Sequence, residues 1–179
     1  MHEAREGLEG HGGHGESSLT LPVTVTLSVL AVLVALVTLL GHRAHTEELL
    51  LQAKASDQWA YFQAKNIRLR ETQSVADILG ALSPADKEKT EALHEKYLKE
   101  VERYEKEKDQ IGEQAKDFEK ERDMVQRRAD RYDAGEVFLE IGLIICSFTL
   151  LTKKKVFWFS GMLLGLVGVA VASSGFLLH

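Results

Sequence analysis

The architecture follows from residues 19–40, which read LTLPVTVTLSVLAVLVALVTLL and contain no charged side chain. A helix of about 20 apolar residues, rising about 1.5 Å per residue, crosses a hydrocarbon core of about 30 Å. We therefore predict a transmembrane helix over residues 19–41. Pro22 falls where we expect the first helical turn, in which its missing N–H group costs no hydrogen bond. The preceding flank is acidic and no small-residue cleavage site follows, which favours an uncleaved anchor over a signal peptide.

Two further apolar blocks, residues 134–152 and 156–178, are separated only by the lysines at 153–155. Two spans joined by such a short link predict a transmembrane helical hairpin. Short basic loops stay on the cytoplasmic side of a membrane, and the Phe-Trp-Phe run that follows the lysines is typical of an interfacial aromatic belt. We expect a multi-pass protein of the inner membrane with a cytoplasmic N-terminus and with residues 42–133 in the periplasm.

Arginines crowd the approach to the second span, at positions 122, 127, 128 and 131, and they favour the opposite orientation. The segment that carries them is about 90 residues long, however, and segments longer than about 60 residues follow the charge rule poorly. The periplasmic placement of residues 42–133 therefore remains the prediction, with a cytoplasmic one as its alternative.

The 179-residue chain divides into apolar segments and one highly charged segment. Apolar residues make up 45% of the chain and charged residues 27%, the latter concentrated between Arg43 and Asp133, so the mean hydropathy of −0.13 averages two unlike parts. The net charge is −5, and acids lie among the bases, which argues against nucleic acid as a partner. The single cysteine, Cys146, excludes an intrachain disulfide and is expected to be a buried apolar residue.

The first 18 residues are rich in glycine and histidine and show no apolar periodicity. We predict a flexible tail over residues 1–18. His11 and His14 could bind a divalent metal weakly, but a glycine-rich coil lacks the further ligands of a closed site. We expect no metal and no cofactor.

Residues 97–132 carry a seven-residue repeat that predicts one strand of a coiled coil. The repeat positions, which advance by alternating steps of four and three, are Tyr97, Val101, Tyr104, Lys108, Ile111, Ala115, Phe118, Arg122, Val125, Ala129 and Tyr132. A period of 3.5 residues sustained for five heptads is typical of a left-handed coiled coil. Lys108 and Arg122 interrupt the seam, either to set register or partner choice, or simply because their long side chains reach out to water. On the exposed faces we expect i,i+4 ion pairs from Glu95 to Lys99 and from Glu102 to Lys106.

The other arm of this hairpin is predicted from about Thr46 to Leu82, with a turn near residues 80–86. Ser83 can cap the next helix, Pro84 suits its first position, and Gly80 loosens the end of the preceding one. The apolar residues of the first arm include Leu49, Ala53, Ala60, Ile67, Val75 and Leu79. Little interrupts the second arm before residue 134, so we expect it to continue into the second span as one helix.

A hairpin of only two helices buries little apolar surface per residue, so we expect apolar side chains outside the seam to stay partly exposed to water. Leu93 and Leu98 are examples. A second group is Trp59, Tyr61 and Phe62, which point to at least two faces of a helix and form either an interaction patch or packing against the second arm. We expect other hairpins or a partner protein to cover the exposed groups.

Small residues recur along the third span at steps of four, three, four and three: Gly161, Gly165, Gly168, Ala172 and Gly175. They form a stripe on one helix face that lets another helix backbone approach closely, as helix packing in lipid requires. The partner of the stripe is either the second span or another subunit.

Glu140 lies about a third of the way into the second span, where an ionisable side chain is costly and marks a candidate functional site. It could bind a proton or a cation, or accept a hydrogen bond from a neighbouring helix. Glu136 lies one turn earlier on the same face, nearer the interface. The alternative is that both acids face a partly hydrated groove near the outer surface and merely orient the helix.

Several of these stretches carry a resemblance. ASDQWAYFQAK after the first span, RYEKEKDQI in the charged arm, and LLTKKKVFWFSGMLLGLVGV with a closing SSGF together resemble the bacterial membrane proteins of domain of unknown function 4337. The resemblance covers most of the chain from about Leu19. It implies three spans and a bacterial origin, and it supplies no activity.

The expected fold is an all-α membrane protein of three transmembrane helices with a long antiparallel coiled-coil hairpin between the first and second. No phosphate-binding loop, metal cluster or nucleophile–base pair appears in the sequence, so we expect no enzyme. The leading hypothesis is a homo-oligomeric scaffold that self-assembles through the stripe and displays its hairpin. The alternatives are a pore or proton-conducting component that uses Glu140, and an accessory subunit of a larger membrane complex.

Overall fold

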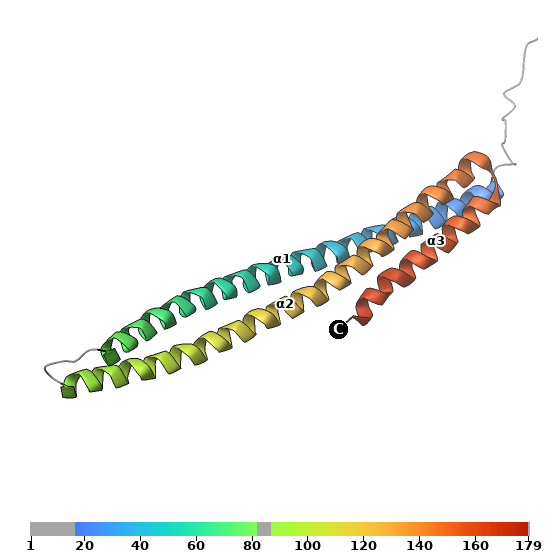
Figure 1. The fold of residues 1–179 in the computed structure, drawn as a ribbon. Helices are drawn as coiled ribbons and strands as arrows, with labels where there is room; N and C mark the ends of the chain where they lie inside the picture. The colour runs from blue at the N-terminus through green and yellow to red at the C-terminus, as the bar shows by residue number, and fades with distance from the viewer. Residues whose placement is uncertain (1–16, 82–86, 179) are drawn as a thin grey trace, which may run out of the picture. The chain divides into compact units, whose positions relative to one another are not determined.

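The computed structural model describes residues 17–81 and 87–178 of the chain. They form three long α-helices, α1 (Ser17–Ala81), α2 (Lys87–Thr152) and α3 (Lys155–Ser174), and a final 3-10 turn, η1 (Gly175–Leu177) (Figure 1). The expected all-α architecture of antiparallel helices is confirmed. The predicted tail lies outside the described residues except for Ser17 and Ser18, with which α1 begins.

The two longest helices each join an apolar segment to a charged one without a break. α1 runs through Gly41, and α2 runs through Gly135 into the second apolar block as expected. An isolated glycine costs a helix about 1 kcal/mol, too little to end one that is packed along its length. Because α1 begins at Ser17, Pro22 lies in the second turn of the helix, and its placement in the first turn was wrong.

The helices divide into two compact units, which we describe separately. The apolar unit contains residues 17–41 and 130–177, and the hairpin unit contains residues 42–129. By length and composition, α1, α2 and α3 are each long and apolar enough to cross a membrane.

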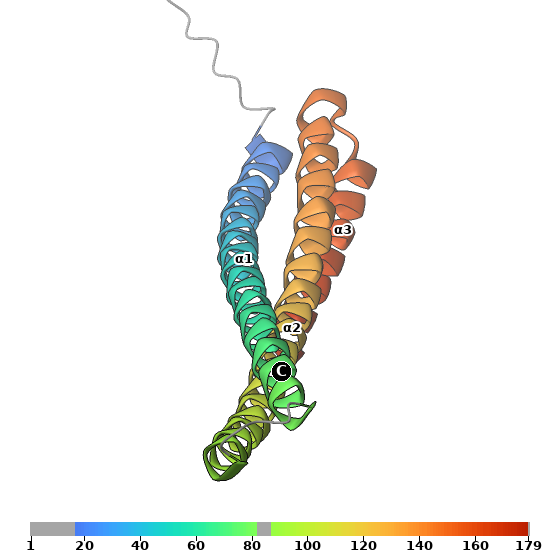
Figure 2. The same cartoon turned by 60° about the vertical axis from the view of Figure 1, so that its left-hand side comes forward.

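Within the hairpin unit, α1 and α2 run antiparallel along a common seam (Figures 1 and 2). The repeat predicted for α2 forms that seam, because every repeat position from Tyr97 to Ala129 is buried or partly buried. The matching buried apolar residues of α1 are Ala44, Leu51, Ala55, Leu69 and Ala76. Of the apolar residues noted earlier on this arm, only Leu79 is partly buried, and the rest are exposed.

Polar contacts fix the antiparallel register of the hairpin. The Gln58 amide donates to Gln114 at 2.6 Å, and the Arg122 guanidinium donates to Gln52 at 2.6 Å. Arg122, one of the two charged interruptions of the seam, thus links the two arms. The predicted pairs on the outer face of α2 are confirmed, at 2.8 Å for Lys99 with Glu95 and 2.7 Å for Lys106 with Glu102.

In the apolar unit, a tight link joins α2 to α3. Lys153 has φ of 55°, in the left-handed region, and its N–H group donates to the Thr149 carbonyl at 2.8 Å. Lys155 already belongs to α3, so only Lys153 and Lys154 lie between the two helices. The helical part of the third apolar block ends at Ser174, followed by η1.

Candidate functional site

The small-residue stripe of α3 is buried within the chain. Gly161, Gly165, Gly168 and Ala172 are buried in α3, and Gly175 is buried in η1. A Cβ atom added at Gly168 would stand 2.8 Å from the Gly135 carbonyl oxygen, and one added at Gly175 would stand 3.0 Å from the Tyr132 ring. The stripe therefore packs against α2 of the same chain.

α2 presents its own set of compact residues to α3, which the sequence reasoning missed. Gly135 and Gly142 are both buried, and a Cβ atom at Gly142 would stand 2.8 Å from the Gly161 carbonyl oxygen. Cys146, one turn further along, is fully buried beside Gly161, as expected for an inert apolar residue. The spacing of seven residues between the two glycines was the available signal, and it allows the two helix backbones to come into contact.

α1 completes this packing. A Cβ atom at Gly165 would stand 2.6 Å from Leu30 Cδ2, and the Trp158 indole N–H donates to Thr26 Oγ1 at 3.1 Å. The stripe is thus fully occupied by α1 and α2 of its own chain. The hypothesis of self-assembly through the stripe therefore requires a different surface of the chain.

The two acids of α2 have different surroundings. Thr38 Oγ1 of α1 donates to Glu136 Oε1 at 2.6 Å, so Glu136 is partly buried and held between helices. Glu140 is exposed, and no hydrogen bond or ion pair to another residue of the described ranges holds it. Its exposed neighbours on α2 are apolar, namely Val137, Ile141 and Ile144. The two acids remain one turn apart on α2, but only Glu136 is held by a neighbouring helix.

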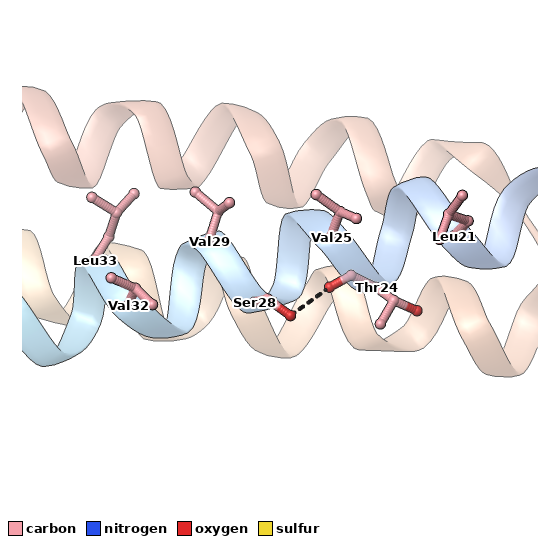
Figure 3. A pocket seen from close by; sticks show the side chains of 7 residues that line it. All are labelled: Leu21, Thr24, Val25, Ser28, Val29, Val32 and Leu33. Carbon is pink, nitrogen blue, oxygen red and sulfur yellow. Dashed lines mark hydrogen bonds between the residues drawn. The ribbon is translucent and has the colours of Figure 1, made fainter.

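A shallow groove runs along the outer face of α1 in the apolar unit (Figure 3). Its volume is about 400 Å³, and apolar side chains such as Leu21, Val25 and Val29 line most of it. Both hydroxyl groups there donate to carbonyl groups of their own helix, Ser28 Oγ to Thr24 at 3.0 Å and Thr24 Oγ1 to Thr20 at 2.8 Å. A surface of this kind suits an acyl chain or another helix, and it offers no reactive group.

The aromatic patch of the first arm divides between the seam and the surface. Trp59 and Phe62 pack edge to face at 5.4 Å, and the Trp59 indole N–H donates to Glu119 of α2 at 2.9 Å. Phe62 covers Gly112, where an added Cβ atom would stand 3.1 Å from the ring. Tyr61 is 50% exposed. Two of the three residues thus hold the arms together, and only Tyr61 is available at the surface.

Lys65 of α1 forms an ion pair with Glu107 of α2 that joins the two arms. Its ammonium group donates to Glu107 at 2.5 Å and lies 5.3 Å from the centre of the Tyr104 ring. The hydrogen bond with Glu107 raises the pKa of Lys65, and the same bond lowers the pKa of Glu107. Lys65 and Glu107 thus form a structural ion pair, which fixes how the two arms align at this polar position of the seam.

Metal-ligating side chains do not gather in the part of the chain that the structure describes. No group of three or more His, Cys, Asp or Glu residues is placed to hold an ion within residues 17–81 and 87–178. His11 and His14 lie outside these ranges.

Comparison with known proteins yields one positive result. A family model matches residues 19–178, which is nearly the whole chain. No curated protein and no solved structure matches it.

Proposed function

The chain belongs to the family described as Domain of unknown function (DUF4337), whose model matches residues 19–178. On this premise we propose that it is a scaffold of the bacterial inner membrane. The apolar unit anchors it, and the hairpin unit binds further copies of the chain. This role is structural, and it involves no catalysis, cofactor or nucleic acid.

The anchor rests on the outward faces of the apolar unit. Large apolar side chains are exposed on all three helices there, for example Val32 of α1, Ile144 of α2 and Leu163 of α3. Such faces are stable in lipid and would aggregate in water. The lysines between α2 and α3 belong on the cytoplasmic side, which puts the N-terminus inside and the hairpin unit in the periplasm.

The observation that carries the binding role is the exposure of large apolar residues on the hairpin unit, whose charge excludes it from a bilayer. Leu49, Leu50, Ile67 and Ile78 of α1 and Leu93 and Leu98 of α2 are all exposed. Each lies on a helix whose seam is already filled by the other arm. Apolar side chains left in water on this scale mark protein-binding surfaces.

The native mass of the purified full chain, measured in a mild detergent and in lipid nanodiscs, tests the proposal. We expect one defined homo-oligomer in both, because the apolar residues of the hairpin are covered by other copies. A monomer in both media would contradict self-assembly. It would favour an accessory subunit that awaits a different protein.

A pore is a second candidate, favoured by the exposure of Glu140 on an apolar face. An acid in that setting needs protonation, water or a partner, and copies arranged around an axis could bring their Glu140 side chains together. If Glu140 lines a pore, reconstituted protein conducts ions and Glu140→Gln changes the ion selectivity. Bilayer recordings that stay silent across a pH range would contradict this candidate.

A further inference from the structure

The first arm of the hairpin has a second face with a seven-residue repeat, directed away from the seam. Its apolar members are Leu50, Ala53, Ala60, Ala64, Ile67 and Ile78. All six are exposed, with Leu50 at 56% and Ile67 at 58%. Asp57 and Glu71 lie on the same repeat and are also exposed. We call this face the α1 outer stripe; it is apolar, narrow and acidic.

The second arm carries a corresponding face with the opposite charge, which we call the α2 outer stripe. Its basic members are Lys96, Lys99, Arg103, Lys106, Lys120 and Arg127, all exposed. The stripe also contains Met124, which is 38% exposed, and two acids, Glu113 and Asp117. Three lysines of the stripe pair with acids of their own helix: Lys99 with Glu95 at 2.8 Å, Lys106 with Glu102 at 2.7 Å and Lys120 with Asp117 at 2.9 Å. Arg103 lies 3.6 Å from Glu107. The stripe itself still carries six basic residues against two acids.

The register within the hairpin shows which residues of the two stripes are level. Phe62 lies against Gly112, and Lys65 bonds Glu107. Counting outward from these contacts along the antiparallel arms puts Glu71 level with Arg103 and Leu50 level with Met124. Copies related by a rotation axis along the hairpin keep equivalent residues level. The α1 outer stripe of one copy then meets the α2 outer stripe of the next in this same register.

We propose that the hairpins assemble head to tail, with the α1 outer stripe of each chain packed on the α2 outer stripe of a second copy. Glu71 pairs with Arg103 of the next copy, and Leu50 packs on Met124 of the next copy. The alanines of α1 let the two helices approach closely. Repeated around an axis, this heterologous contact closes into a ring.

Charge distinguishes this arrangement from the two symmetric ones. Pairing two α1 outer stripes would set Asp57 and Glu71 against acids, and pairing two α2 outer stripes would set lysines and arginines against one another. Like charges that face each other across an interface repel, whereas α1 against α2 sets Glu71 against Arg103 and leaves a single like-charged pair, Asp57 with Asp117. Asp57 of one copy is level with Asp117 of the next copy. Lys116 and Lys120 lie beside Asp117 and reduce the repulsion between the two acids.

The inference rests on the proposed self-assembly, and disulfide cross-linking in nanodiscs tests it separately. Two differently tagged full-length chains, both carrying Cys146→Ser, are co-expressed, one with Leu50→Cys and the other with Met124→Cys. Oxidation should join the two tags, because the two cysteines meet only between copies. Chains that carry Leu50→Cys alone are the matched control and should not cross-link to each other.

Charge reversal then tests the pairing. Glu71→Arg in the Leu50→Cys chain should lower the cross-linked fraction by about tenfold, and Arg103→Glu in the Met124→Cys chain should restore it. Asp77→Arg, an exposed reversal on α1 outside the stripe, should leave the fraction unchanged.

The outcomes separate the two proposals. Oligomeric protein that fails to cross-link Leu50→Cys to Met124→Cys, or that cross-links Leu50→Cys chains to each other, overturns the head-to-tail interface and leaves self-assembly standing. Monomeric protein overturns both. Oligomeric protein with the expected cross-link, lost and restored by the two reversals, supports both.

Discussion

At the scale of single residues, Lys65 shows how a polar side chain occupies an apolar seam. It sits at a repeat position of α1, with its side chain 13% exposed, between Tyr61 and Tyr104 and against Glu107. Its aliphatic stem packs while its ammonium group keeps a charged partner. The contact fixes register because the two charges meet in only one alignment of the arms.

This pair makes the stability of the hairpin depend on pH. Glu107 has a lowered pKa, so its contribution is complete above the ordinary value of 4.5 and is lost as the pH falls through the lowered value. Lys65 has a raised pKa, so its contribution is complete below the ordinary value of 10.5 and is lost as the pH rises through the raised value. We expect Lys65→Met to lower the free energy of unfolding at pH 7 and to lower it less at pH 3.

Chemical denaturation followed by Trp59 fluorescence, with Trp158→Phe in every protein, measures the effect. Lys99→Met is the control, because Lys99 and Glu95 are 74% and 68% exposed and such surface pairs contribute little. An equal loss of stability for Lys65→Met at both pH values would show that packing alone, without the ion pair, explains the role of Lys65.

At the scale of the helical elements, α2 and α3 are held by backbone contact across paired glycines. A methyl group at Gly142 would stand 2.8 Å from the Gly161 carbonyl oxygen and 3.0 Å from the Gly165 nitrogen. Neither atom belongs to a flexible side chain, so the helices must move apart. Overpacking of this kind costs about 1–3 kcal/mol.

Cys146 reports on this contact because it is the only cysteine and lies buried in it. We expect Gly142→Ala to increase the rate of maleimide labelling of the thiol in detergent by about tenfold, since about 1.4 kcal/mol corresponds to a factor of ten. Gly80→Ala is the matched control, because its added methyl group meets only the movable His94 ring, at 3.3 Å. An unchanged rate for Gly142→Ala would mean that the glycines do not hold α2 against α3.

At the scale of the whole molecule, the proposed orientation in the membrane depends chiefly on the three lysines at 153–155. We expect Lys154→Cys to react with a membrane-impermeant maleimide only after spheroplasts are permeabilised. Gln73→Cys, on the exposed side of the hairpin, should react in intact spheroplasts. Both proteins carry Cys146→Ser, and the reverse pattern of labelling would show that the arginines before the second apolar block control the topology instead.

The features predictable from sequence are those with a local period. Apolar blocks long enough for helices, the α2 seam and the ion pairs from Glu95 and Glu102 all depend on residues three, four or seven apart on one helix. These spacings bring side chains together whatever the rest of the chain does, because the geometry of an α-helix repeats along its axis.

The remaining features depend on which helices meet and in which register. The α1 seam was not recognisable from its sequence, because it contains polar residues such as Gln58 and Lys65. Their hydrogen-bond partners, Gln114 and Glu107, lie on α2. The stripe at Gly161 and Gly165 was visible in the sequence, but its occupation by Gly142 and Leu30 of the same chain was not. Contacts between residues far apart in the chain arise when the three helices pack together. The spacing of residues within one helix does not show which helix it meets or in which register.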